Sequence, residues 1–183
     1  VTQNYPPTTM KNNYQTTRLS LSSLNPADAA FILELVNTPE WVRFIGERNL
    51  KTEEDAVAYI QRIMQNPDIM YWVVRLKEQQ EPIGIITFIK RDYLEHHDIG
   101  FAFLARYGKQ GFAYEATAVV LADIAQNREH AHILATTVED NMNSIKLLQK
   151  LGLQFEKQIQ NGNDTLLVFG APTHALLPGN VVS

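Results

Sequence analysis

The sequence contains no cysteine among its 183 residues. Disulfides, thiolate metal sites and a cysteine nucleophile are therefore excluded, and this absence is compatible with a reducing compartment. Basic residues are also few, 16 against 20 acidic ones, which gives a net charge of −4. Because nucleic-acid binding normally requires a concentrated basic surface, we expect no nucleic-acid partner.

Long apolar runs are lacking as well. No run approaches the ~20 apolar residues that a membrane-spanning helix needs, and no secretory leader pattern opens the chain. We therefore expect no membrane partner and a cytoplasmic location. The length fits one domain, and a chain of this size buries about 70% of its unfolded surface without disulfides or metals.

What the chain does contain is a series of apolar patterns separated by turn residues. Alternation of apolar and polar residues predicts strands, and a period of three to four predicts helices. Helices are expected after the capping residues Asn25 and Thr52 and over residues 112–126 and 142–150. The predicted strands cover residues 18–22, 71–76, 83–89, 99–104, 132–138, 153–160 and 165–169.

This order of elements predicts one mixed α+β domain with a partly antiparallel sheet. We place the domain at residues 16–170, after a polar N-terminal arm, residues 1–15, and before a short tail, residues 171–183.

The segment around which the chain is organised is residues 107–116. Gly108 and Gly111 lie three apart where a predicted strand becomes a predicted helix. A helix start carries unpartnered backbone N–H groups and the positive end of the macrodipole, and glycine lets a ligand approach the main chain. The segment therefore has the chemistry of an anion site. The plainer alternative, a turn that only joins strand to helix, is the commoner role of such glycines.

Five segments together resemble the GCN5-related N-acetyltransferases, the GNAT family, and within it the RimJ/RimL-like branch. They are residues 18–28, 81–84, 98–101 (Asp-Ile-Gly-Phe), 110–116 (Gln-Gly-Phe-Ala-Tyr-Glu-Ala) and 141–153, which begins Asn-Met-Asn-Ser and ends Lys-Leu-Gly-Leu. The resemblance covers about residues 16–170. It implies a mostly antiparallel central sheet of about seven strands, with helices on both faces and a splay between the fourth and fifth strands.

The resemblance also implies an N-acetyltransferase that uses acetyl-CoA as co-substrate and needs no metal. The CoA pyrophosphate is expected on the backbone of the glycine loop. One departure is that the Gln or Arg that usually begins the family loop is Gly108, and the next residue, often Gly, is Lys109. The implied cofactor-binding residues are Phe101, Ala102, Phe103, Lys109, Gln110, Gly111, Phe112, Ala113, Asn141 and Ser144.

Acetyl transfer requires a neutral amine and a stabilised leaving thiolate. Asp98 holds the family's acidic position and is our first candidate for the base. Glu95, His96 and His97 are alternatives, and a solvated surface role stays open for all four.

The position of the tyrosine that protonates the thiolate in many relatives is Leu148 here, so Ser144 is the candidate for a contact with the sulfur or a pantetheine amide. A thiol pKa near 8.5 makes the thiolate a tolerable leaving group without a strong acid. Asn141 binds the pantetheine or caps its helix, and Glu115 is expected to face away from the pyrophosphate.

The implied acceptor is an amine, either a peptide N-terminus or a small molecule such as a polyamine or an aminoglycoside. A peptide N-terminus asks less of a base than lysine does, because its pKa is near 8 rather than about 10.4. Candidate substrate residues are Trp41, Phe44 and Trp72, with Arg43, Tyr71 and Tyr93 as further possible walls, although most aromatics at such places are core.

Gly108 and Leu148 also motivate an alternative function, a non-catalytic acyl-CoA-binding or interaction module on the same fold. A monomer and a homodimer are both compatible with the sequence.

Overall fold

The computed structural model describes residues 10–127 and 129–176, and its centre is one eight-stranded sheet. The strands are β1 (Asn13–Gln15), β2 (Leu19–Ser23), β3 (Ile69–Leu76), β4 (Pro82–Ile89), β5 (Asp98–Phe103), β6 (His132–Thr137), β7 (Gln154–Asn161) and β8 (Asp164–Pro172). They lie in the order β1-β2-β3-β4-β5-β6-β8-β7. All neighbours are antiparallel except β5 and β6, which are parallel.

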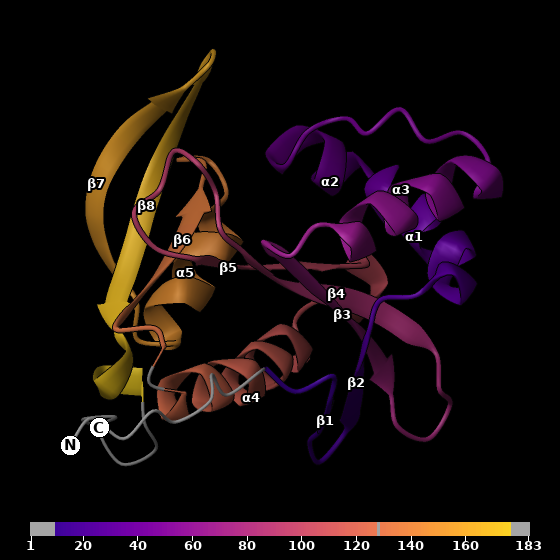
Figure 1. Ribbon diagram of the computed structural model, residues 1–183, viewed down its shortest axis with the longest axis horizontal. Coiled ribbons are helices and arrows are strands. Elements are labelled where there is room, and N and C mark those ends of the chain that lie inside the picture. Colours follow the sequence, from indigo (N-terminus) through magenta and orange to yellow (C-terminus); the bar gives the residue numbers. More distant parts are fainter. Residues whose placement is uncertain (1–9, 128, 177–183) are drawn as a thin grey trace.

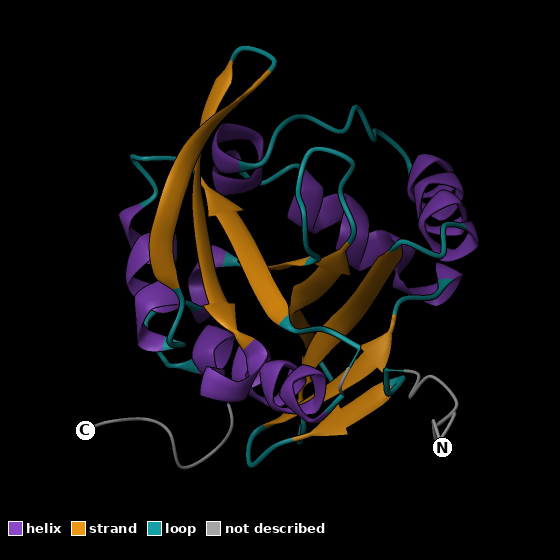
Figure 2. Ribbon diagram, turned by 60° about the vertical axis from the view of Figure 1, so that its left-hand side comes forward, coloured by secondary structure: helices purple, strands orange, loops and turns teal. Residues whose placement is uncertain are grey.

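Helices cover both faces of this sheet (Figures 1 and 2). They are α1 (Ala29–Val36), α2 (Pro39–Phe44), α3 (Glu53–Gln65), α4 (Phe112–Gln126) and α5 (Met142–Lys150), with single 3-10 turns at Pro26–Asp28, Ala105–Tyr107 and Thr173–Leu176. The predicted N-cap at Asn25 and the predicted capping box at Thr52 are confirmed, before the first 3-10 turn and before α3, and Asn25 also forms a capping box, with Asp28. Within the described residues, no helix combines the length and apolar character that crossing a membrane requires.

Two apolar cores lie on opposite faces of the sheet because alternate strand residues point opposite ways. On β3, Trp72 and Val74 pack into the core under α4 and α5, whereas Val73 packs into the core under α1 and α3. The fold predicted from the sequence, a mostly antiparallel α+β sheet with helices on both faces, is therefore confirmed, with eight strands instead of about seven.

The sheet divides between β5 and β6. These strands pair only where Asp98 lies beside Leu134, and the Leu134 N–H donates to the His97 carbonyl at 3.0 Å. Beyond that point the strands separate, so β6, β7 and β8 lean away from the rest of the sheet (Figure 1). The predicted splay is therefore confirmed, with Asp98 at its apex.

Two segments differ from the sequence-based expectation. Residues 13–15, expected in a loose arm, form the edge strand β1 and bury Tyr14, whose hydroxyl donates to Asp123 of α4 at 2.7 Å. Three residues are too few for a periodic pattern, so this strand gave no signal. At the other end, β8 runs on to Pro172, and the Thr173 N–H donates to the Ala131 carbonyl at 3.0 Å. Residues 1–9 and 177–183 of the expected arm and tail lie outside the described residues.

Candidate functional site

The loop that leads into α4 has a backbone suited to binding an anion. Lys109 and Gly111 both have left-handed backbones, with φ of +59° and +80°. Gly111 precedes the first residue of α4, and the Glu115 N–H donates to the Gly111 carbonyl at 3.0 Å. The N–H groups of residues 112–114 come before this first helical bond and have no partner within the helix. These N–H groups lie at the positive end of the helix dipole.

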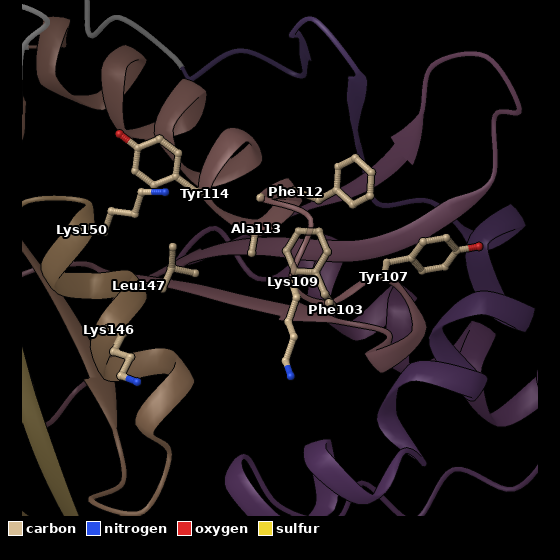
Figure 3. Close-up of a pocket in the computed structure, with 11 residues that line it drawn as sticks. Phe103, Tyr107, Lys109, Phe112, Ala113, Tyr114, Lys146, Leu147 and Lys150 are labelled. Carbon is tan, nitrogen blue, oxygen red and sulfur yellow. The ribbon is translucent and has the colours of Figure 1, made fainter.

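A cavity of about 260 Å³ lies against this loop, between α4 and α5 (Figure 3). Three lysines line it, Lys109 from the loop and Lys146 and Lys150 from one face of α5. The Lys150 ammonium lies 4.4 Å from the centre of the Tyr114 ring. The other lining residues are Phe103, Tyr107, Gly108, Gly111, Phe112, Ala113, Tyr114 and Leu147. Main-chain donors and three cationic side chains thus surround one cavity, which is a setting for a phosphate-bearing ligand.

Arg18, just before β2, holds this loop from behind. Its guanidinium donates to the Gln110 carbonyl at 2.9 Å and to Glu115 at 3.0 Å, and it lies 4.3 Å from the centre of the Phe112 ring. Glu115 also accepts from the Thr16 hydroxyl at 2.8 Å. Burial acts to raise the pKa of Glu115, but the hydrogen bonds from Thr16 and Arg18 outweigh it and keep this pKa below its usual value. The Glu115 carboxylate is therefore held at Thr16 and Arg18, away from the cavity, as the sequence led us to expect.

Asp98 is buried at the apex of the splay. One carboxylate oxygen, Oδ2, accepts from Arg91 Nε at 2.9 Å and from the Thr136 hydroxyl at 3.5 Å. The other, Oδ1, is buried and has no hydrogen-bond partner within the described residues. Burial raises the pKa of Asp98, while Arg91 and Thr136 act to lower it. A buried carboxylate with a raised pKa and a free oxygen is equipped to accept a proton.

The direction of the Asp98 side chain follows from strand alternation. Ile99, Phe101 and Phe103 pack into the core under α4, whereas Ala102 packs under α1 and α3. Asp98 shares the parity of Ala102, so it faces the helices α1–α3. The glycine loop and Asp98 therefore lie at opposite ends of β5, with the open side of the splay between them.

The alternative bases lie elsewhere. The His97 ring stacks on Phe88 at 4.8 Å and contacts the His130 ring at 4.6 Å, both measured between ring centres. Glu95 and His96 line a second cavity of about 410 Å³, together with Ala131, His132, Leu134, Glu156 and Lys157. The described residues contain no group of three or more His, Asp or Glu side chains arranged to hold a metal.

Asn141 and Ser144 form the first turn of α5. The Asn141 side chain accepts the Ser144 N–H at 3.3 Å, so Asn141 caps the helix, and Ser144 is buried. Neither residue lines the loop cavity, but Lys146 and Leu147, which follow them on α5, do.

The residues expected on β5, Phe101, Ala102 and Phe103, lie beyond the single pairing with β6. The β6-facing main chain there therefore has no strand partner. Phe103 also lines the loop cavity.

The three candidate substrate residues lie on different sides of the sheet. Trp72 is fully buried under α4, where its indole N–H donates to the Lys11 carbonyl at 3.0 Å. It is a core residue, and its assignment as a substrate residue is corrected. Trp41 and Phe44 both belong to α2, on the side of the sheet that Asp98 faces.

Phe44 lies beside Arg43, whose ion pair with Asp140 spans the splay. It is half buried under the guanidinium of Arg43, which lies 4.7 Å from the centre of the Phe44 ring. Arg43 pairs with Asp140 at 2.8 Å and so joins α2 to the segment just before α5.

Sequence reasoning missed four of the residues that build this site. Lys146 and Lys150 are four apart, so their shared helix face was visible in the sequence. Arg18 and Arg91 had no such signal, because their contacts with Glu115 and Asp98 depend on how the strands assemble.

Known proteins resemble this chain along most of its length. A family model described as "Acetyltransferase (GNAT) domain" matches residues 18–154. The uncharacterized N-acetyltransferase YnaD of Bacillus subtilis (strain 168) is 27% identical over 153 residues, which cover 81% of this chain and 89% of that protein.

Two solved structures share the fold. An acetyltransferase (GNAT family) from Bacillus anthracis superposes with a TM-score of 0.74 at 22% identity, covering 88% of this chain and 98% of that chain. Spermidine N-acetyltransferase from Vibrio cholerae, solved in complex with CoA and spermine, superposes with a TM-score of 0.73 at 16% identity, covering 86% and 97%.

Proposed function

The chain belongs to the GNAT acetyltransferase family, and we propose that it is an acetyl-CoA-dependent N-acetyltransferase of the RimJ/RimL-like branch. In this proposal the acetyl group moves directly from the thioester to a primary amine, either a peptide N-terminus or a small-molecule amine.

One observation carries the proposal, the cavity at the start of α4, which is lined by Lys109, Lys146 and Lys150 and lies against a helix start whose first N–H groups have no partner within the helix. CoA bears a pyrophosphate, and helix N-termini bind such groups through their backbone. Gly108 replaces a side chain that usually contributes here, and Lys109, Lys146 and Lys150 supply positive charge in its place. Arg18 contributes indirectly, since it fixes the Gln110 carbonyl and the first turn of α4.

The remainder of the cofactor would follow β5 toward Asp98. The β6-facing main chain of Phe101, Ala102 and Phe103 has no strand partner, so it is available to the amide groups of a pantetheine arm. In this proposal Asn141 and Ser144, in the first turn of α5, contact the same arm. We assign to the Ser144 hydroxyl a hydrogen bond to the sulfur or to a pantetheine amide.

Bound acetyl-CoA supplies the activated acetyl group. Asp98 takes the proton that the acceptor amine must lose as its nitrogen bonds to the acetyl carbon and the carbon–sulfur bond breaks. The free Oδ1 is the atom that accepts this proton, because Oδ2 is engaged by Arg91. Arg91 favours the ionised carboxylate, which is the form that can act as a base.

The test is to follow thiol release from acetyl-CoA with a panel of amines, and to measure CoA binding separately by calorimetry. Turnover that falls strongly in Asp98→Asn and little in the neighbouring Asp92→Asn supports the proposal, since Asp92 is exposed. Tight CoA binding without turnover on any amine would favour the alternative of a non-catalytic acyl-CoA-binding module. Absence of CoA binding at millimolar concentration would reject both.

A further inference from the structure

Arg48 is a half-buried arginine in the connection between α2 and α3. None of the ion pairs within residues 10–127 and 129–176 involves it. Its guanidinium donates to the Gly46 carbonyl at 3.2 Å, which is the one hydrogen bond that its five N–H donors make within the described residues. A partly desolvated guanidinium that is not paired with a carboxylate can bind an anionic group of a ligand.

The loop around Arg48 is fixed at both ends. The N–H groups of Ile45 and Gly46 both donate to the Trp41 carbonyl, at 2.8 and 2.9 Å. The Asn37 side chain donates to the Leu50 carbonyl at 3.0 Å. Between these anchors the backbone is left-handed at Gly46 and at Asn49, with φ of +120° and +56°. Such conformations persist where the surrounding structure determines them, so the direction of Arg48 is set by the fold.

A second donor lies beside this guanidinium. The Arg48 guanidinium carbon is 5.6 Å from the centre of the Trp41 ring. Trp41 is 4% exposed, and its indole N–H is buried without a hydrogen-bond partner. A buried donor without a partner is unfavourable, so an acceptor atom that reached it would be bound favourably. The Arg48 guanidinium therefore lies beside a tryptophan whose indole N–H has no hydrogen-bond partner within the described residues.

This place is connected to Asp98 through Tyr71 of β3. Tyr71 packs on the α1–α3 side of the sheet, the side that Asp98 faces. Trp41 and Tyr71 belong to the same apolar core, and Tyr71 lies opposite Thr87 of β4, which lies opposite Gly100, two residues along β5 from Asp98. Burial and the neighbouring Tyr59 raise the pKa of Tyr71, while the charges of Arg48 and Arg91 act to lower it. Arg91 in turn contacts Asp98 at 2.9 Å.

Three other arginines on this side are paired with carboxylates. Arg91 is neutralised by Asp98, Arg43 by Asp140 and Arg75 by Asp28. An acceptor rich in positive charge would therefore meet Arg48 with no carboxylate to offset it.

We propose that Arg48, supported by the indole N–H of Trp41, binds an anionic group of the acceptor, so that the acceptor is a primary amine with a carboxylate close by. This inference rests on the proposed function, since it places the acceptor amine at Asp98. The carboxylate belongs either to a free amino acid or to an acidic side chain at a peptide N-terminus.

The experiment uses matched probes that differ only in this charge. L-Alanine is compared with L-alaninamide, and aspartyl-alanyl-alaninamide with asparaginyl-alanyl-alaninamide, with spermidine as a polycation. Each probe is tested for turnover with acetyl-CoA and for binding in the presence of CoA, using calorimetry. The pair that shows the larger preference for the charged member identifies the source of the carboxylate.

The variants are Arg48→Gln, Arg48→Lys and Trp41→Phe, with Arg62→Gln on the exposed end of α3 as the matched control. We expect Arg48→Gln to weaken the carboxylate-bearing probe about tenfold, mainly in KM, as for a lost charge-assisted hydrogen bond. The uncharged probe and CoA affinity should be unchanged, Arg48→Lys should restore part of the loss, and Trp41→Phe should give a smaller loss.

Equal losses for charged and uncharged probes, or tightest binding of spermidine, would overturn the inference. The binding arm decides the inference even without turnover. Absent turnover with normal CoA affinity would count against the proposed function alone.

Discussion

The Nε atom of Arg91 lies 2.9 Å from Oδ2 of Asp98, and the two partners of this ion pair differ in exposure. The Asp98 side chain is 4% exposed and the Arg91 side chain 35%. The pair is thus a buried carboxylate held by an arginine that reaches solvent. Its other oxygen, Oδ1, is buried and accepts no hydrogen bond from the described residues.

Arg91 is expected to set the pH dependence of turnover. Burial raises the pKa of Asp98 and Arg91 opposes this, so Arg91→Gln removes the opposition and raises this pKa further. The base would then lose activity by protonation at a higher pH, and the acidic limb of the kcat profile should move upward. The check is a pH profile of kcat in the wild type and in Arg91→Gln.

The surface variant Arg106→Gln, which breaks an exposed pair with Glu34, is the control for a general effect of losing an arginine. The acidic limb should stay in place there, and the limb due to Asp98 should be absent from Asp98→Asn. An unmoved limb in Arg91→Gln would remove Asp98 from the role of base.

Gly111 gives a second prediction, because its left-handed backbone lies at the start of α4. Gly111→Ala should destabilise the fold by about 1 kcal/mol through the unfavourable φ. It should also weaken CoA binding, because relief of the unfavourable φ would shift the backbone N–H groups at the start of α4. Urea unfolding and calorimetric titration with CoA measure the two effects.

Gly162 is the matched control for Gly111. It also has a left-handed backbone, with φ of +62°, but a Cβ would meet no heavy atom within 4 Å. Gly162→Ala in the β7–β8 turn should reproduce the loss of stability and leave CoA affinity unchanged. Equal CoA affinities in the two variants would contradict the role of the loop.

The lysines of the loop cavity should make CoA binding dependent on salt. Lys146→Gln and Lys150→Gln should each weaken CoA about two- to fivefold, the range for exposed charge pairs. The double variant should show a smaller loss of affinity between low and high salt, since fewer charges are left to screen. Lys51→Gln, near the start of α3, should bind CoA as the wild type does, and a salt dependence equal in all variants would contradict this assignment.

Local chemistry explains why much of the fold was predictable. The caps at Asn25 and Thr52 act on neighbouring residues, and the glycine loop lies between a strand and a helix that are adjacent in sequence. Each pattern fixes its own segment regardless of the rest of the chain. The resemblance to a known family then supplied the splay, which no local pattern encodes.

Contacts between distant segments account for what was not predicted. Arg18 and Glu115 are 97 residues apart, and no sequence pattern in either segment predicts that they pair. Trp72 is a large aromatic residue of the kind that often lines a substrate pocket, but it packs in the core on the α4 side of β3. The register of the strand decides which face of the sheet each residue joins. Tyr14 is buried only because a three-residue strand pairs with β2.

The rings of His97 and His130 predict a loss of stability in acid at the contact between β5 and β6. Burial lowers the pKa of both rings, and the charge of His130 lowers that of His97 further. The folded state therefore binds protons less tightly than the unfolded chain, whose histidines titrate near 6.5. The stability that these rings contribute is complete above about pH 6.5, and it is lost as the pH falls from there through the lowered folded values.

His130→Phe tests this, because a phenyl ring keeps the contacts with Phe88 and His97 and cannot take up a proton. Between pH 7 and pH 5 its free energy of unfolding should fall less than that of the wild type, and the exposed His174→Phe variant should follow the wild type. Since the Leu134 N–H is bonded to the His97 carbonyl, its hydrogen exchange should accelerate in acid in the wild type and less in His130→Phe. Equal acid sensitivity in the wild type and His130→Phe would show that these rings do not control the contact on which Asp98 lies.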